Sequence, residues 1–173
     1  MDIKEKIGTV PNWPIDGVMF RDITTLLQEP DVFRETCDAF YNRYKDMKID
    51  KIVGIDARGF IFGAVLAYKM NVGFIPVRKK GKLPFKTIQE TYTLEYGEDT
   101  LEIHEDAIQK NEKVIIVDDL IATGGTIGAT VKLVKKLGGD IIECAFIVEL
   151  PDLNGRDQIQ GCKIYSITEF EGE

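Results

Sequence analysis

Residues 114–126 read Val-Ile-Ile-Val-Asp-Asp-Leu-Ile-Ala-Thr-Gly-Gly-Thr. The apolar start of this stretch predicts a buried strand over Lys113–Val117. Two acids and a loop of small residues follow, and the apolar spacing over Thr126–Leu137 predicts a helix that ends before Gly138-Gly139. This order of strand, loop and helix is typical of α/β proteins, in which ligands bind beyond the carboxyl ends of parallel strands.

The loop between this strand and helix has the composition of an anion-binding site. Gly124 and Gly125 lack side chains, so the backbone can adopt positive φ and approach a phosphate closely. Amide N–H groups from Ala122 to the helix start at Thr126 would converge on the anion. The hydroxyls of Thr123 and Thr126 add further donors. We therefore predict a phosphate-binding loop here.

The two acids before the loop, Asp118 and Asp119, are unsuited to a phosphate because ionised carboxylates only accept hydrogen bonds. They suit the vicinal hydroxyls of a ribose. Other interpretations are a solvated loop or a magnesium site of the receiver-domain kind. The following Ala-Thr-Gly-Gly-Thr favours a sugar phosphate, and the segment lacks the Gly-Lys-Ser/Thr of nucleoside-triphosphate loops and the spacing of a dinucleotide-binding motif.

The flanking sequence predicts one α/β domain over residues 1–173. Short apolar runs indicate further strands, and apolar residues at helical spacing indicate further helices. The expected strands are Lys51–Ile55, Gly73–Val77, Lys113–Val117, Ile141–Glu149 and residues 163–167, and the expected helices are residues 31–47, Gly59–Met70 and Thr126–Leu137. We expect a mostly parallel central sheet of about five strands with helices on both faces.

A second anion site is expected where the strand Lys51–Ile55 ends, at Asp56-Ala57-Arg58. The forked guanidinium of Arg58 can bind a pyrophosphate, and Gly59 opens the next helix, whose amides would face the same ligand. The alternative is an ordinary capped turn with a surface arginine. We favour the anion site because both loops follow strands that end at the same edge of the sheet.

Residues 78–104 are expected to form a basic loop and a mobile lid. Residues 78–84 read Arg-Lys-Lys-Gly-Lys-Leu-Pro, and we expect Arg78 and Lys82 to reach the pyrophosphate, whereas the other lysines are solvated. Residues 90–104 alternate polar with apolar side chains around a turn at Gly97, which indicates a two-stranded antiparallel ribbon. Such a ribbon is marginally stable alone.

Composition excludes several classes of protein. The 173 residues carry 22 Lys and Arg against 29 Asp and Glu, a net charge of −7 that disfavours nucleic acid or anionic membrane as a partner. The cysteines, Cys37, Cys144 and Cys162, have no zinc-site or disulfide spacing and are interpreted as reduced thiols. Without a signal sequence or a long apolar run, we expect a cytoplasmic protein.

The Asp-Asp-(x)₂-Ala-Thr-Gly-Gly-Thr pattern resembles the 5-phosphoribosyl-1-pyrophosphate (PRPP) signature of type I phosphoribosyltransferases. Over nearly the whole chain, the sequence is similar to the adenine phosphoribosyltransferase family. The segments that carry this similarity are Pro14–Thr24, Asp56–Gly63, Arg78–Pro84, Tyr92–Gly97 and Val114–Thr126. Asp16 stands where the family often has proline before Gly17.

The resemblance implies roles for further residues. A hood formed by residues 1–29 would cover the purine. Backbone groups of Met19, Phe20 and Arg21 would read its edge, and the side chains of Met19 and Leu120 would offer apolar faces. Glu95 and Tyr96 match a pair in the family's flexible loop, and Glu95 is the candidate acid–base group at the purine nitrogens. It also implies a cis peptide bond between Asp56 and Ala57. We leave His104, the single histidine, a structural role.

The expected reaction transfers the 5-phosphoribosyl group of PRPP to N9 of adenine, giving AMP and pyrophosphate. Mg²⁺ would arrive on PRPP oxygens, with no dedicated protein metal site, and the family implies a homodimer. The alternatives are a phosphoribosyltransferase for hypoxanthine or guanine, or a PRPP-sensing regulator without catalysis.

Overall fold

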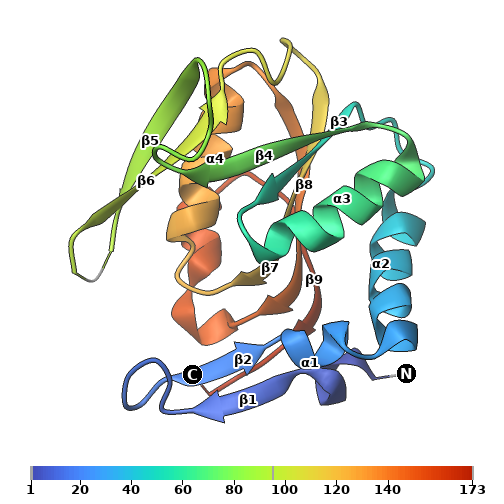
Figure 1. Cartoon of the computed structure of the whole chain (residues 1–173), viewed down its shortest axis with the longest axis vertical. Helices are drawn as coiled ribbons and strands as arrows, with labels where there is room; N and C mark the ends of the chain where they lie inside the picture. Colours follow the sequence, from blue (N-terminus) through green and yellow to red (C-terminus); the bar gives the residue numbers. More distant parts are fainter. Residues whose placement is uncertain (1, 95, 173) are drawn as a thin grey trace.

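The computed structural model describes residues 2–94 and 96–172, and its main element is a seven-stranded sheet with the strand order β5-β6-β4-β3-β7-β8-β9 (Figure 1). Five neighbouring strands are parallel: β4 (Gly73–Lys79), β3 (Lys51–Ile55), β7 (Lys113–Ile121), β8 (Asp140–Glu149) and β9 (Ile164–Glu169). The antiparallel strands are β5 (Thr87–Thr93) and β6 (Glu98–His104). The predicted mostly parallel α/β sheet is confirmed.

The five expected strands form the parallel part of the sheet, and the two strands of the predicted ribbon extend it to seven. β4 continues past the predicted end at Val77, and Arg78 and Lys79 pair with β6. The ribbon also begins at Thr87 rather than at residue 90. This pairing satisfies backbone N–H and C=O groups along the edge of β4. The base of the lid is therefore part of the sheet through Leu101 and Glu102, whereas the end of β5 and the start of β6 extend beyond it (Figure 1).

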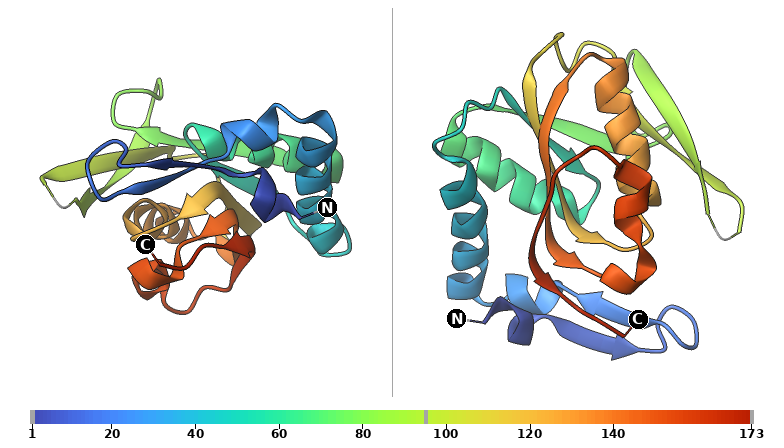
Figure 2. Two further views of the ribbon diagram at one scale, coloured as in Figure 1. Left: turned by 90° about the horizontal axis from the view of Figure 1, so that it is seen from below. Right: turned by 180° about the vertical axis from the view of Figure 1, so that it is seen from behind.

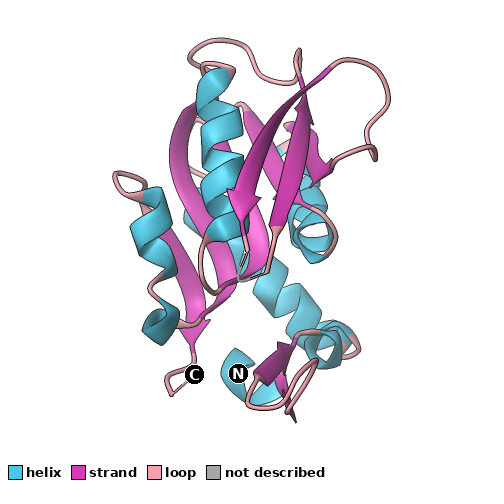
Figure 3. Ribbon diagram, turned by 90° about the vertical axis from the view of Figure 1, so that its left-hand side faces the viewer, coloured by secondary structure: helices cyan, strands magenta, loops and turns pink. Residues whose placement is uncertain are grey.

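Helices cover both faces of the sheet (Figure 2, Figure 3). Every residue of Val114–Val117 is fully buried, which explains the unbroken apolar run. Successive side chains of β7 point to opposite faces. Ile115 and Val117 pack in the core with α2 (Pro30–Tyr44) and α3 (Arg58–Met70). Val114 and Ile116 pack in the core with α4 (Gly125–Lys136).

The three predicted helices are confirmed, with one boundary corrected. The helix expected over residues 31–47 is α2, which ends at Tyr44. Tyr44 is fully buried, whereas Met47 lies beyond the helix and is 43% exposed, so its apolar character does not mark the helical face. None of the described helices has both the length and the apolar character needed to cross a membrane.

The N-terminal residues form a small separate layer at the bottom of Figure 1. It contains the 3₁₀ helix η1 (Ile3–Lys6), the antiparallel strands β1 (Gly8–Pro11) and β2 (Met19–Asp22), and the short helix α1 (Thr24–Leu27). Met19 is 37% exposed and, among the described strands, its strand pairs only with β1, so this segment is not a strand of the main core. Two further 3₁₀ helices, η2 (Pro151–Leu153) and η3 (Gly155–Ile159), follow β8.

Candidate active site

The two acids lie inside β7 rather than beyond it. Leu120 and Ile121 still pair with β8, so the prediction that this strand ends at Val117 is wrong. Hydrogen bonding to β8 continues β7 through the polar residues Asp118 and Asp119. A search for apolar runs cannot predict this extension, because it depends on the neighbouring strand. Asp118 and Asp119 are consequently held on a hydrogen-bonded strand, and the small-residue loop begins only at Ala122.

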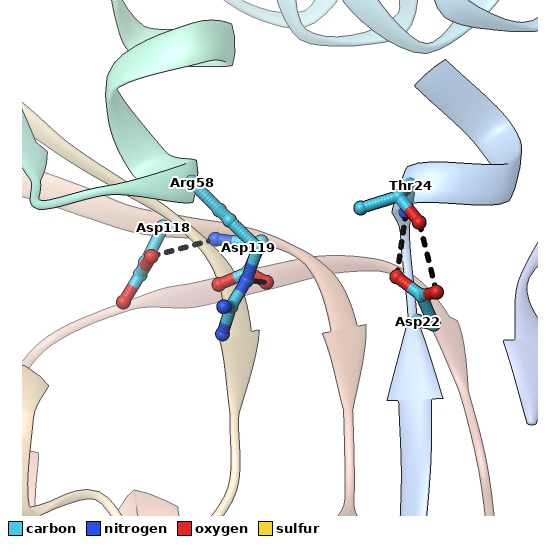
Figure 4. A network of polar contacts seen from close by, with 5 residues as sticks. All are labelled: Asp22, Thr24, Arg58, Asp118 and Asp119. Carbon is cyan, nitrogen blue, oxygen red and sulfur yellow. Dashed lines mark hydrogen bonds and ion pairs between the residues drawn. The ribbon is translucent and has the colours of Figure 1, made fainter. Parts of the chain in front are cut away.

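The two carboxyl groups have different environments (Figure 4). Asp119 is 4% exposed, and its Oδ2 is paired with Arg58 Nε. The Oδ1 of Asp118 accepts the backbone N–H of Asp119 at 2.8 Å. Burial, and then the charge of Asp119, raises the pKa of Asp118 well above its ordinary value. Hydrogen-bond donors or cations on a ligand would stabilise the negative charge of these two carboxylates. Asp118 and Asp119 are therefore suited to accept hydrogen bonds from hydroxyl groups.

The predicted phosphate loop has no space for side chains at its centre. Gly124 has φ +86°, and a Cβ there would lie 2.3 Å from the carbonyl oxygen of Gly155. Gly125 is the first residue of α4, so the N–H groups of the first helical turn have no intrahelical partner. Thr126 lies in this turn and Thr123 is exposed beside it. The local geometry therefore presents main-chain donors to an anion.

The second predicted anion site lies directly beside the first. The Asp56-Ala57 peptide bond is cis, as the resemblance implied. Arg58 is the first residue of α3. A Cβ at Gly59 would lie 2.7 Å from the carbonyl oxygen of Val117, so glycine lets the start of α3 approach the backbone of β7.

One cavity of about 260 Å³ joins these two segments. Its lining consists of residues 55–58 and 118–127. It therefore brings together the acids, the glycine loop and the Asp56–Arg58 turn, which are distant in the sequence. The predicted ribose, phosphate and pyrophosphate positions are adjacent in the structure.

The basic loop contributes less directly. Arg78 Nε donates to Asp56 Oδ2 at 2.8 Å, so its guanidinium contacts a residue of the cavity wall. Lys82 is exposed and is not among the residues that line the cavity. Lys79, expected to be solvated, pairs with Asp99 at 2.8 Å.

An apolar pocket of about 390 Å³ lies between the hood and the end of β7. It brings together Met19, Phe20, Arg21 and Leu120, the residues predicted for the base. The remaining lining residues are Gly17, Val18, Ala122, Leu150 and Leu153. Leu150 and Leu153 were not among the residues predicted from the sequence. Leu150 directly follows β8, so the rule that sites lie at carboxyl ends of strands would have identified it.

The hood is held in place by contacts of Arg21 and Asp22, the last two residues of β2. The guanidinium of Arg21 lies 4.3 Å from the ring centroid of Phe170, and its NH1 donates to Thr9 Oγ1 at 2.7 Å. At the end of the strand, Asp22 accepts the backbone N–H of Thr24 at 2.9 Å and its hydroxyl at 2.8 Å (Figure 4). The C-terminal segment thus helps to fix the base pocket.

The lid is only partly described. Glu95, the predicted acid–base group, lies outside the described residues. Tyr96 is 86% exposed and lines neither cavity. His104 lies in β6, and its Nε2 is 2.8 Å from the carbonyl oxygen of Pro84. This contact is consistent with the structural role predicted for it. Among residues 2–94 and 96–172, no group of three or more His, Cys, Asp or Glu side chains is placed to hold a metal ion.

The fold and the paired cavities define a class of protein. The family model described as the phosphoribosyl transferase domain matches residues 22–170, and the chain belongs to that family. An adenine phosphoribosyltransferase of Desulfosudis oleivorans is 66% identical over 173 residues, covering 100% of both chains. One from Nitrosospira multiformis is 54% identical and covers 99% of both.

Solved structures agree with these relatives. The adenine phosphoribosyltransferase of Thermoanaerobacter pseudethanolicus has a TM-score of 0.94 at 46% identity, covering 98% of both chains. The Saccharomyces cerevisiae enzyme, complexed with an imino-altritol bisphosphate and adenine, has a TM-score of 0.91 at 40% identity, covering 96% of this chain and 97% of that one. Within the phosphoribosyltransferases, the chain therefore belongs with the adenine phosphoribosyltransferases.

Proposed function

We propose that PRPP binds in the polar cavity and adenine in the apolar pocket beside it, and that the chain transfers the 5-phosphoribosyl group to N9 of adenine. The single observation that carries this proposal is a shared wall. Leu120 and Ala122 line both cavities. A base in one cavity and a ribose in the other would therefore meet at these residues, as bond formation between N9 and C1 requires.

The residue roles on the sugar side follow from the donors and acceptors at each position. Asp118 and Asp119 accept hydrogen bonds from the ribose hydroxyls, and the amides of residues 122–126 bind the 5-phosphate. Arg58 and the Asp56-Ala57 turn bind the pyrophosphate. Arg58 pairs with Asp119 through Nε, and both residues line the polar cavity, so this ion pair holds the guanidinium at the proposed pyrophosphate position.

The basic loop completes the pyrophosphate site. The support for Arg78 is its hydrogen bond to Asp56, a residue that lines the cavity. Lys82 is exposed and would have to move with the loop, together with Tyr96 of the lid, to reach bound PRPP.

On the base side, apolar contacts hold a flat purine. Met19 and Leu120 lie in the same pocket and would contact opposite faces of adenine, while backbone groups of Phe20 and Arg21 read its edge. Glu95 is the proposed acid–base group, and we expect Glu95→Gln to lower turnover while leaving PRPP affinity largely intact.

The reaction forms a bond between N9 and C1 while the bond from C1 to pyrophosphate breaks. The chain's residues orient the two substrates, stabilise charge on the leaving pyrophosphate and exclude water when the lid closes. Mg²⁺ would be carried by PRPP oxygens and neutralise their charge. The carboxylates of Asp56, Asp118 and Asp119 line the same cavity, a donor set that fits an ion bound through its own waters.

We also propose a cytoplasmic homodimer made of a single domain, in which residues 1–29 form the hood and residues 78–104 the basic loop and lid. The exposed Tyr68 and Phe85 side chains, 87% and 83% accessible in the single chain, suit coverage by a second copy. All three cysteines are free thiols, as a reducing compartment requires. Sedimentation and cell fractionation test these proposals.

The decisive experiment incubates the purified chain with labelled adenine, PRPP and Mg²⁺. We expect labelled AMP, and much less product when hypoxanthine or guanine replaces adenine. Equal turnover of another purine would reject the assignment of adenine as acceptor. PRPP binding without any product would instead favour the PRPP-sensing regulator.

A further inference from the structure

The lid ribbon contacts the helix that begins at the phosphate loop. Strand β5 lies along α4 (Figure 1). The side chains of Glu90 and Tyr92 point to the same face of the strand because they are two positions apart, and both line one cavity with residues of α4. Glu90 pairs with Lys136 at 2.5 Å and approaches Lys132 at 3.9 Å. Tyr92 contacts the first turn of the helix. One strand of the lid therefore contacts α4 over much of its length.

The contact of Tyr92 is with the phosphate loop itself. A Cβ at Gly125 would lie 3.0 Å from Cδ2 and 3.4 Å from Cε2 of the Tyr92 ring, and its third nearest atom would be Cγ of the same ring. The tyrosine hydroxyl lies 3.5 Å from Thr126 Oγ1, which is long for a hydrogen bond between hydroxyls. Packing of the ring on Gly125 is therefore the stronger part of the contact.

The loop is held from two sides. On one side, a Cβ added at Gly124 would lie 2.3 Å from the carbonyl oxygen of Gly155 and 2.9 Å from Cγ of Gln158, both in η3. On the other side, Tyr92 is the closest neighbour of Gly125. The side formed by η3 follows β8 of the central sheet, whereas the side formed by Tyr92 belongs to the lid ribbon.

We propose that Tyr92 is a positioning residue: its ring on Gly125 couples the lid ribbon to the loop that binds the 5-phosphate of PRPP. Phosphate binding then orders the ribbon, and docking of the ribbon strengthens phosphate binding by the same factor. The inference rests on the proposed assignment of residues 122–126 to the 5-phosphate.

Hydrogen–deuterium exchange with ribose 5-phosphate as the probe tests the coupling directly. In the unmodified chain, the probe should slow exchange at residues 123–127 and also along β5. In Tyr92→Ala, the probe should still slow exchange at residues 123–127, whereas β5 should show no change. Persistent slowing of β5 in this variant would overturn the inference.

The same measurement separates this inference from the site assignment. If ribose 5-phosphate leaves residues 123–127 of the unmodified chain unchanged, the phosphate-loop assignment is wrong and the coupling is overturned with it. Slowing at residues 123–127 without any change along β5 of the unmodified chain overturns the coupling alone.

Kinetics provide matched controls. We expect Tyr92→Ala to lower kcat/KM for PRPP about tenfold, within the usual range of coupling between sites, with the KM for adenine within about twofold. Tyr92→Phe keeps the ring and should stay within about threefold of the unmodified enzyme. Glu90→Gln removes the ion pairs to the distal part of α4, which are worth little at exposed sites, and should change kcat/KM less than about twofold.

A double-mutant cycle isolates the ring contact even if Tyr92→Ala is poorly stable. Gly125→Ala places its methyl group against Tyr92, so it should weaken ribose 5-phosphate binding severalfold in the unmodified background. Because the three nearest atoms all belong to Tyr92, that loss should largely disappear in the Tyr92→Leu or Tyr92→Ala background. Additive losses in every background would refute direct contact between ring and loop.

Discussion

The two cavities of the site share a wall but are built differently. The polar cavity is formed by β7 and by the first turns of α3 and α4. Beside it, a Cβ at Gly59 would meet the backbone of β7, and a Cβ at Gly124 would meet the backbone of η3. The apolar pocket has one wall from the core and the other from a hairpin whose Met19 is 37% exposed. Main-chain geometry therefore defines the sugar-phosphate side, and side-chain contacts define the base side.

The largest expected effect tests the sugar side. Replacing Asp118 and Asp119 together by Asn removes charged acceptors for the ribose hydroxyls, each worth about 1.5–3 kcal/mol. We expect kcat/KM for PRPP to fall by roughly two to four orders of magnitude in steady-state kinetics. Asp140→Asn, at the opposite end of the parallel strands, is the control. A change of only a few-fold in the double variant would reject the ribose assignment.

The second prediction concerns the phosphate loop and its fit to the core. Gly124→Ala combines left-handed backbone strain with a Cβ 2.3 Å from Gly155. We expect a loss of about 2–5 kcal/mol in the free energy of unfolding, measured with denaturant. Gly161→Ala is the matched control, because Gly161 has the same φ of +86° but no atom within 4 Å of the added Cβ. Equal losses in both variants would show that close packing at Gly124 is unimportant.

The third prediction tests the support behind this loop. Arg156 Nε and NH2 donate to Glu149 at 2.6 and 2.7 Å, which ties η3 to the end of β8. The hydrogen bond from Arg156 outweighs burial and lowers the pKa of Glu149 below its ordinary value of 4.5. We expect Glu149→Gln to cost about 1–3 kcal/mol of unfolding free energy at neutral pH.

The pH dependence of this cost has a definite sign. A carboxyl whose pKa is lowered by folding stabilises the protein above the pKa of the unfolded chain and loses this contribution as the pH falls through the folded value. The difference between the unmodified chain and Glu149→Gln should therefore be constant near neutral pH and shrink below about pH 4.5. A difference that grows on acidification would contradict the ion pair.

The smallest effect is expected on the base side. Met19→Ala removes part of an apolar face that is already one-third exposed, a loss of about 1 kcal/mol or less. The KM for adenine should rise about three- to fivefold, with the KM for PRPP unchanged. An equal rise for PRPP would mean that the hood also shapes the sugar cavity, and the contrast between the two regions would weaken.

Local patterns predicted those parts of the fold that depend on local sequence. Lys51–Ile55 is a strand with the predicted limits, because it is a short apolar run between two polar turns. The glycine loop before α4 was identifiable from the residues alone, because glycine readily adopts the positive φ and tolerates the close approach that the structure has at Gly124. The Asp56–Arg58 turn was likewise placed correctly beside them.

The remaining features depend on partners far along the chain. The extension of β7 to Ile121 comes from pairing with β8, and the ribbon joins the sheet through Arg78 and Lys79 of β4. The pairing of Arg58 with Asp119 joins residues that the sequence separates widely. Apolar side chains such as Leu150 are common in cores, so its residue type does not mark it as part of the base pocket, and only its position after the end of β8 does.

With the proposed assignment of the two cavities, the shared wall at Leu120 and Ala122 would separate recognition of the acceptor from activation of the donor. Leu120 and Ala122 lie at the end of β7, opposite the hairpin of β1 and β2. Changes in that hairpin would therefore alter which base enters the apolar pocket without moving C1 of the ribose in the polar cavity. In such a fold, changes confined to the hood of residues 1–29 would allow new acceptor bases, while the polar cavity would keep the same phosphoribosyl donor.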